Sequence, residues 1–164
     1  MNTDRIEKEI LLNAPLERVW NALSDSKRFG FWFGVDFDGP FIAGARTTGR
    51  IRPTRVDPEV AALQESHAGT PFTFRVDRIE PMRCIAFRWH PYAIDSNIDY
   101  SNEPTTLITF ELQPVGETTR LKLTESGFDQ IPMSRRLEAF QANDGGWSHQ
   151  MKLIGKYLAL PDAH

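Results

Sequence analysis

The sequence predicts an α+β fold in which a one-sided antiparallel sheet is covered by one long C-terminal helix. Three observations lead to this prediction. Five segments between residues 45 and 126 alternate apolar and polar side chains, as strands with one covered face do. A stripe of apolar residues with helical spacing follows near the C-terminus. A strand-like segment and two short helical segments precede the five strands.

The first elements are a strand and two short helices. Apolar and charged residues alternate over residues 6–13, which indicates a strand. Pro15 suits the first turn of a helix, and four apolar residues then follow at spacings of three and four: Leu16, Val19, Trp20 and Leu23. Ser24 and Asp25 can cap a second helix, which we expect to end near Gly30.

Six aromatic residues are concentrated between residues 29 and 41. They are Phe29, Phe31, Trp32, Phe33, Phe37 and Phe41. Three glycines and a proline interrupt this stretch, so it is not expected to form one regular element. We interpret it as a plug of aromatic rings at the point where the short helices meet the sheet.

The five strands are expected to form a sheet with one apolar face. They cover residues 45–55, 71–79, 83–92, 105–114 and 118–126, with hairpin turns at residues 80–82 and 115–117. The connection over residues 56–69 is too long for a tight hairpin and carries a weak helical signal at residues 59–64. Alternation places on the apolar face Phe72, Phe74, Val76, Ile85, Phe87, Trp89, Ile108, Phe110, Leu112, Leu121 and Leu123.

The C-terminal stripe supplies the cover for this face. Trp147, Met151, Ile154 and Leu158 recur at helical spacing, with Gln150 and Tyr157 at the edges of the stripe, and Pro161 ends the helix. We expect the first three of these residues to face the sheet. Because Gly145 and Gly146 precede the stripe, residues 134–143 form either a separate turn or an earlier, kinked part of the same helix.

Length and charge limit the classes of partner. With 164 residues, the chain is expected to form a single domain over residues 1–164. Its formal charge of −3, from 19 basic and 22 acidic residues, gives no electrostatic basis for binding nucleic acid or an anionic membrane. The lone cysteine, Cys84, excludes an internal disulfide, and no leader or membrane-spanning apolar run is evident. A cytoplasmic protein is therefore expected.

No familiar catalytic template fits the sequence. It has no glycine-rich phosphate loop after a strand, no nucleophile elbow around a serine and no helix with paired histidines. The four histidines lie at spacings that are not typical of a metal site, so no metal and no cofactor is expected. His90 ends a strand at what would be the rim of a pocket. Two interpretations of His90 remain open: a solvent-facing residue with a structural role, or a residue that binds a ligand at the rim.

Glu125 is the charged residue that stands out in this pattern. It continues the inward-facing series of Leu121 and Leu123, so a regular strand would direct its carboxylate toward the covered face. A buried carboxylate is costly unless it is paired or hydrogen-bonded. Two interpretations remain open: a structural carboxylate bonded to Trp147 or Gln150, or a group that orients a ligand.

Three stretches of the chain resemble a known family. Residues 10–25, residues 87–91 and residues 121–128, the last followed by Gly146, Trp147 and the final helix, are similar to the family named for the activator of the heat-shock-protein-90 ATPase. This family belongs to the larger helix-grip group of lipid-transfer START domains, birch-pollen-type allergens and polyketide cyclases. The resemblance implies the topology β-α-α-β6-α and a cavity between the sheet and the C-terminal helix, but no universal catalytic residue.

The resemblance and the pattern together favour a binding function over catalysis. We expect a hydrophobic or amphipathic small molecule to bind in the cavity, oriented by Glu125 or Gln150. The expected walls are Phe74, Phe87, Trp89, Phe110, Leu123, Trp147, Met151 and Ile154. Three alternatives stay open: rings that fill the core and leave no cavity, a cyclase- or hydratase-type enzyme that uses Glu125, and a protein-interaction domain in stress response or chaperone function. The co-chaperone role is disfavoured because we expect no second domain.

Overall fold

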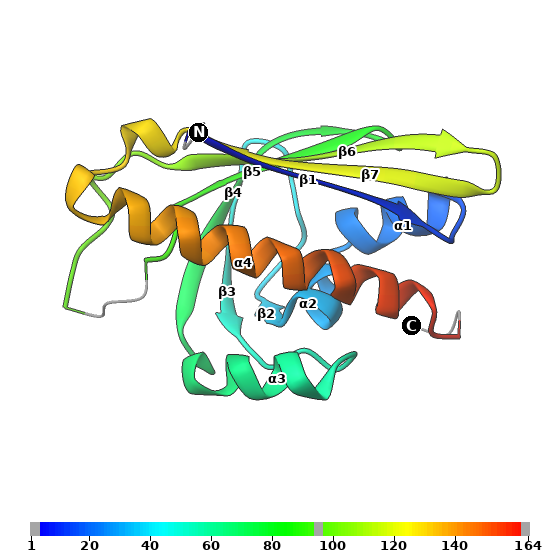
Figure 1. The fold of residues 1–164 in the computed structure, drawn as a ribbon, viewed down its shortest axis with the longest axis horizontal. Helices are drawn as coiled ribbons and strands as arrows, with labels where there is room; N and C mark the ends of the chain where they lie inside the picture. The colour runs from blue at the N-terminus through cyan, green and yellow to red at the C-terminus, as the bar shows by residue number, and fades with distance from the viewer. Residues whose placement is uncertain (1–3, 94–96, 162–164) are drawn as a thin grey trace.

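The computed structural model describes residues 4–93 and 97–161, and it contains the expected antiparallel sheet covered by a long helix. Seven strands pair in the order β1-β7-β6-β5-β4-β3-β2. Their bounds are β1 Arg5–Leu12, β2 Val35–Phe37, β3 Arg46–Ile51, β4 Pro71–Glu80, β5 Cys84–Trp89, β6 Thr106–Val115 and β7 Thr118–Ser126. The curved sheet partly encloses the helix α4, as Figure 1 shows. The predicted α+β class is confirmed.

The helices lie on the concave side of the sheet or at its edge (Figure 1). They are α1 Leu16–Ser24, α2 Ser26–Phe33, α3 Pro58–Gln64 and α4 Met133–Leu158, with short 3-10 turns η1 Glu65–His67 and η2 Phe128–Gln130. Six strands separate α2 from α4, so the chain follows the expected β-α-α-β6-α order. The helix α3 is an addition to that order, and it forms where the connection carried its weak helical signal.

The helix α2 ends later than its sequence suggests. Asp25 caps its start by accepting hydrogen bonds from the backbone N–H groups of Lys27 (2.9 Å) and Arg28 (3.3 Å). Its end lies at Phe33, because Gly34 with φ of 100° takes the left-handed conformation that stops the helix. Gly30 has a different role, since a Cβ atom there would lie 2.1 Å from the carbonyl oxygen of Val35.

This close approach brings the aromatic plug into the centre of the molecule. Phe29 is fully buried, and its ring centroid lies 5.8 Å from that of Phe87 and 6.0 Å from that of Phe110. The Nε1–H of Trp32 donates to the carbonyl oxygen of Ala22 at 2.9 Å and so ties α2 to α1. The aromatic rings therefore pack between the helices and the sheet, as expected. The short strand β2, which pairs with β3, was not predicted from the sequence.

The helix α4 is continuous over 26 residues and includes Gly145 and Gly146. The segment before the glycines is therefore the first part of the same helix, not a separate turn. Trp147, Met151 and Ile154 are buried against the sheet side, as expected. Their packing supplies the stabilisation that helix propensity lacks at the two glycines.

Candidate functional site

A cavity of about 640 Å³ lies where α4 passes the end of the sheet formed by β3, β4 and β5. The helix α3 and the turn η1 close another side of it. Its apolar lining residues are Phe33, Val35, Ile51, Val60, Leu63, Pro71, Phe72, Trp89, Tyr92, Ala93 and Ala142. Its polar lining residues are Gln64, His67, Thr70, His90, Gln141, Asn143, His149 and Gln150, with Gly34, Gly145 and Gly146 completing the wall. The lining contains no Asp, Glu, Lys or Arg side chain among the described residues.

The glycines of α4 keep this cavity open. Asn143, Gly146 and Gln150 follow one another at spacings of three and four, so they share one face of the helix. All three line the cavity, and a Cβ atom at Gly146 would meet no atom within 4 Å. The exposed glycine costs about 0.5–1 kcal/mol of stability relative to alanine. The absent side chain leaves space at the centre of the helix face that lines the cavity.

Gln150 presents a buried, unused hydrogen-bond acceptor at this site. Its Nε2 donates to the carbonyl oxygen of Phe33 at 3.0 Å, which fixes the orientation of the amide. Its Oε1 is buried and has no hydrogen-bond partner in the described part of the chain. Gln64 also donates to the oxygen of Phe33, at 3.1 Å, but its own Oε1 accepts from the N–H of Thr54 at 2.7 Å. The lone acceptor of Gln150 is therefore suited to a hydroxyl or amine of a bound molecule.

Glu125 lies behind the cavity wall and is completely buried. Its Oε2 accepts from the indole N–H of Trp89 (2.8 Å) and the hydroxyl of Thr106 (2.5 Å). Its Oε1 accepts from the indole N–H of Trp147 at 2.7 Å, and the amide of Asn143 reaches both oxygens at 3.0 and 3.2 Å. Burial raises the pKa of this carboxyl above its ordinary value, although the four donors act in the opposite direction.

The Glu125 side chain lies on the covered face, as its alternation with Leu121 and Leu123 predicts, but its carboxylate does not line the cavity. Two of its donors, Trp89 and Asn143, do line it. Of the two partners considered for Glu125 from the sequence, Trp147 is a donor, whereas Gln150 bonds to Phe33 instead. Glu125 joins β5, β6 and β7 to α4 through side-chain hydrogen bonds.

Most of the expected wall residues lie in the core and not at the cavity. Trp89 and Gln150 line the cavity. Those that are buried away from it are Phe74, Phe87, Phe110, Leu123, Trp147, Met151 and Ile154. The cavity of about 640 Å³ therefore lies to one side of these residues. The physical reason is the aromatic plug, because Phe29 and Phe33 occupy the space between these strands and α4.

The residues that sequence reasoning missed come mainly from α3 and its flanks. Val60, Leu63 and His67 line the cavity from the long connection after β3, and Phe72 lines it from the start of β4. The available signal was the length of that connection and its weak helical pattern. The exposed fraction of Leu63 is 63%, which is high for a large apolar side chain and fits a surface that a ligand covers.

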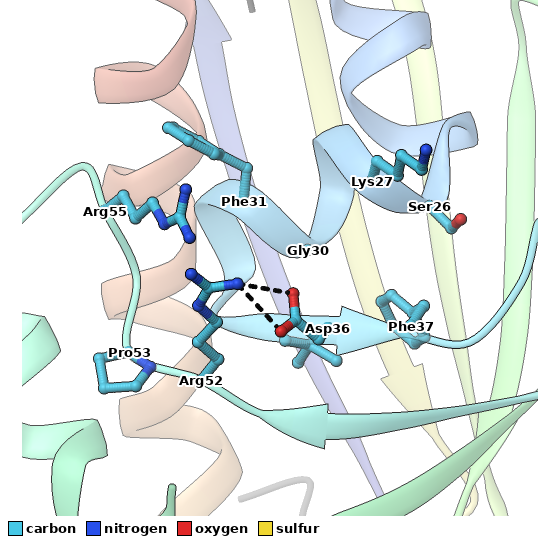
Figure 2. A pocket seen from close by; sticks show the side chains of 10 residues that line it. Ser26, Lys27, Gly30, Phe31, Asp36, Phe37, Arg52, Pro53 and Arg55 are labelled. Atoms are coloured by element: carbon cyan, nitrogen blue, oxygen red, sulfur yellow. Dashed lines mark hydrogen bonds and ion pairs between the residues drawn. The ribbon is translucent and has the colours of Figure 1, made fainter. Parts of the chain in front are cut away.

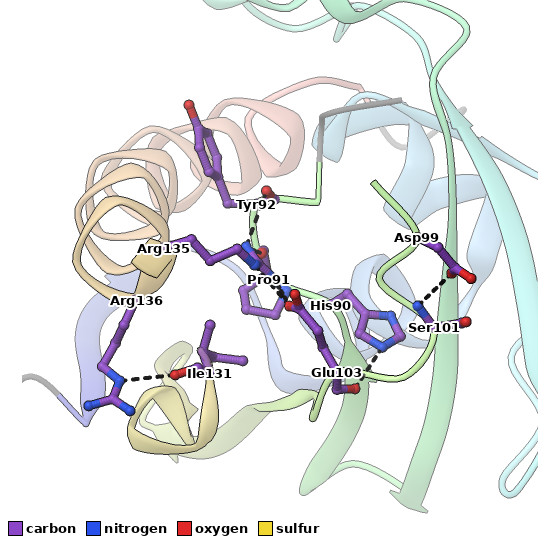
Figure 3. A network of polar contacts seen from close by, with 9 residues as sticks. All are labelled: His90, Pro91, Tyr92, Asp99, Ser101, Glu103, Ile131, Arg135 and Arg136. Carbon is purple, nitrogen blue, oxygen red and sulfur yellow. Dashed lines mark hydrogen bonds and ion pairs between the residues drawn. The ribbon is translucent and has the colours of Figure 1, made fainter. Parts of the chain in front are cut away.

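The rim of the cavity after β5 is held by a polar network (Figure 3). Arg135 of α4 pairs with Glu103, with its Nη2 at 2.7 Å and its Nε at 2.8 Å from the Oε1 of Glu103. Its Nη1 also donates to the carbonyl oxygen of Pro91 at 2.8 Å. The Nε2 of His90 lies 3.1 Å from the carbonyl oxygen of Glu103. These bonds attach the segment that carries His90 and Tyr92, both cavity-lining residues, to the start of α4.

Cys84 and the possible metal ligands among the described residues show no activated arrangement. Within residues 4–93 and 97–161, no three His, Cys, Asp or Glu side chains are grouped so that they could hold a metal ion. Cys84 is buried, and burial raises the pKa of its thiol, which is the opposite of what an activated nucleophile needs. No helix in the described part of the chain is long and apolar enough to cross a membrane.

The comparisons with known proteins agree with this architecture. A family model described as "Activator of Hsp90 ATPase homolog 1-like protein" matches residues 13–159. Protein MLL2253 from Mesorhizobium loti is similar in structure, with a TM-score of 0.69 and 21% identity over 94% of this chain and 96% of that chain. CalU16 from Micromonospora echinospora has a TM-score of 0.60 and 18% identity, over 94% of this chain and 76% of its own.

DynU16, a putative protein in the dynemicin biosynthetic locus, has a TM-score of 0.66 and 23% identity over 95% of this chain. The present chain spans about half of DynU16, since it covers 47% of that chain. At these identities the likeness concerns the fold. No curated protein matches the sequence.

Proposed function

Since the chain belongs to the family of Activator of Hsp90 ATPase homolog 1-like proteins, we propose that it binds a hydrophobic or amphipathic small molecule without catalysing a reaction. The proposed site is the cavity of about 640 Å³ between α3, α4 and the end of the sheet. The observation that carries the proposal is this largely apolar cavity, in which Gln150 offers an acceptor with no partner among the described residues. Its volume falls within the range of roughly 300–1,000 Å³ that is usual for small-molecule sites.

The distribution of groups supports an amphipathic ligand. Val60, Leu63 and Phe72 offer an apolar surface to a hydrocarbon or ring system, and each Å² of apolar area removed from water contributes roughly 25 cal/mol before ordering costs. A hydroxyl or amine on the ligand would donate to the Oε1 of Gln150. A ligand with one such donor and an apolar body would therefore complement the cavity.

The position of Glu125 favours binding over chemistry. A cyclase or hydratase would need a general acid or base within hydrogen-bond reach of its substrate. The carboxylate accepts from four side chains and does not line the cavity, so Trp89 and Asn143 would have to move aside before it could contact a ligand. The hydrogen bonds of Glu125 serve to hold the wall in place.

The proposal can be tested with the fluorescent apolar probe N-phenyl-1-naphthylamine. The wild-type protein should bind the probe with enhanced emission, and Gly146→Leu should weaken binding at least tenfold because the new side chain projects into the cavity. Gly146→Ala controls for helix propensity. Ser148→Leu adds the same bulk on α4 at an exposed position that does not line the cavity. Equal affinities for wild type and Gly146→Leu would contradict the proposal.

A further inference from the structure

A second cavity, of about 310 Å³, lies on the outer side of α2, between that helix, β2 and the segment that follows β3. Figure 2 shows the side chains that line it. It shares only Val35 with the larger cavity. The larger cavity has no Asp, Glu, Lys or Arg in its described lining, whereas this one is rich in charge: its lining includes Lys27, Asp36, Arg52 and Arg55. The two cavities therefore suit different ligands.

The cavity carries more positive than negative charge, although the chain as a whole has a formal charge of −3. Three cationic side chains line it against a single carboxylate, that of Asp36. The guanidinium groups of Arg52 and Arg55 point into the same space (Figure 2). An anion bound in this cavity would be attracted by both groups.

The hydrogen bonds leave much of the donor capacity unused. Arg52 contacts Asp36 through one nitrogen, Nη1, at 3.2 and 3.0 Å from the two carboxylate oxygens. Its Nη2 and Nε have no partner within the described residues. Arg55 lies with its guanidinium carbon 5.7 Å from the ring centroid of Phe31 and has no acidic partner in the same part of the structure. An oxyanion could therefore accept from both arginines without displacing Asp36.

The remaining walls suit the body of a small organic molecule. Phe31 and Pro53 contribute apolar surface near the arginines, and Phe37 lines the cavity beyond Asp36 (Figure 2). Gly30 forms the floor, and α2 approaches β2 so closely there that no larger residue fits. The volume is at the low end of small-molecule sites, which limits the ligand to roughly one ring with its substituents.

We infer that this cavity binds a small organic oxyanion, whose phosphate or carboxylate group is held by Arg52 and Arg55 and whose ring lies against Phe31 and Pro53. Arginine pairs bind both kinds of oxyanion through paired N–H donors. The site is independent of the proposed apolar cavity. A ligand for one does not need the other.

The test is calorimetric titration at low salt with three probes: phenyl phosphate, benzoate and inorganic phosphate. We expect phenyl phosphate or benzoate to bind, and the tighter of the two identifies the head group. Arg55→Gln should weaken binding about tenfold, because it removes a charged donor. Asp36→Asn should strengthen binding about threefold or more, since it removes the competing negative charge and frees Arg52.

The matched control is Arg46→Gln, which makes the same change of charge on β3 outside the cavity. It should leave the affinity within about twofold of the wild type, because screening reduces distant surface charges. Three results would overturn the inference: no organic probe binding more tightly than about 10 mM, Arg55→Gln and Arg46→Gln having equal effects, or Asp36→Asn weakening the binding. Inorganic phosphate that binds as tightly as phenyl phosphate would refute the contact with the ring.

Discussion

Replacing Glu125 with glutamine should destabilise the fold, because the amide preserves the shape of the side chain but places an NH₂ group, which only donates, among four side chains that themselves donate. In the wild type, Oε1 accepts from Trp147 at 2.7 Å, and Oε2 accepts from Trp89 and Thr106 at 2.8 and 2.5 Å. If the amide oxygen takes the place of Oε2, the indole N–H of Trp147 faces an NH₂ group. The indole N–H of Trp147 and the new NH₂ group are then buried donors without acceptors, at a cost of about 1–3 kcal/mol each.

The loss should depend on pH with a definite sign. Burial raises the pKa of Glu125 above its ordinary value of 4.5, so between these two values the folded protein holds a proton that the unfolded chain has released. The stability that this group contributes is therefore greatest below 4.5 and falls as the pH rises through the folded pKa. The glutamine variant does not titrate, so its deficit relative to the wild type should shrink as the pH increases.

Urea unfolding followed by tryptophan fluorescence at about pH 5 and pH 8 measures both effects. The matched control is Glu111→Gln, an exposed carboxylate on β6 that should change stability by less than about 0.5 kcal/mol. A Glu125→Gln variant as stable as the control at both pH values would refute the reasoning. A deficit that grows with pH would refute the assigned direction of the pKa shift.

Further substitutions test other parts of the structure. Trp147→Ala should lower the free energy of unfolding by about 3–5 kcal/mol in urea titrations, as large core truncations do. Trp147→Phe should lower it less, because it keeps a ring. An unchanged unfolding midpoint for Trp147→Ala would contradict the burial of Trp147 in the core. Gly145→Ala and Gly146→Ala should each raise stability by about 0.5–1 kcal/mol in thermal melts, since no atom lies within 4 Å of a Cβ at either position. A lower melting temperature would contradict the open space around these two positions. Arg135→Lys keeps the charge but loses the paired contacts with Glu103, so limited proteolysis should cleave the rim segment faster than in the wild type, and equal rates would argue against the network as its anchor.

The sheet could be predicted from the sequence because its pattern is local. The strand β7 lies where alternation placed it, at Thr118–Ser126, and the same parity put Glu125 on the covered face. The stripe from Trp147 to Ile154 likewise identified the buried face of α4. In a strand, side chains two positions apart point to the same face, and in a helix those three or four positions apart do so. The buried face can therefore be predicted from the spacing of apolar residues.

The cavity could not be placed in this way, because its position depends on which side chains fill the concave side of the sheet. Phe29 lies on the short helix α2 and contacts the rings of Phe87 and Phe110. The spacing of residues in the sequence does not predict these contacts between distant elements. The predicted end of α2 near Gly30 was wrong for a related reason. Gly30 lies within the helix, where it allows the backbone to pass close to Val35. The role of α3 in closing the cavity also follows from tertiary packing.

The most direct test of the central claim is to locate a bound apolar ligand by intermolecular NOEs between N-phenyl-1-naphthylamine and methyl groups of the isotope-labelled protein. Binding in the cavity predicts NOEs to Ile51, Val60 and Leu63, which line it. NOEs to Leu123 and Ile154, which are buried in the core away from the cavity, would contradict that location. The absence of any NOE under conditions that saturate the protein with probe would contradict the proposed binding function.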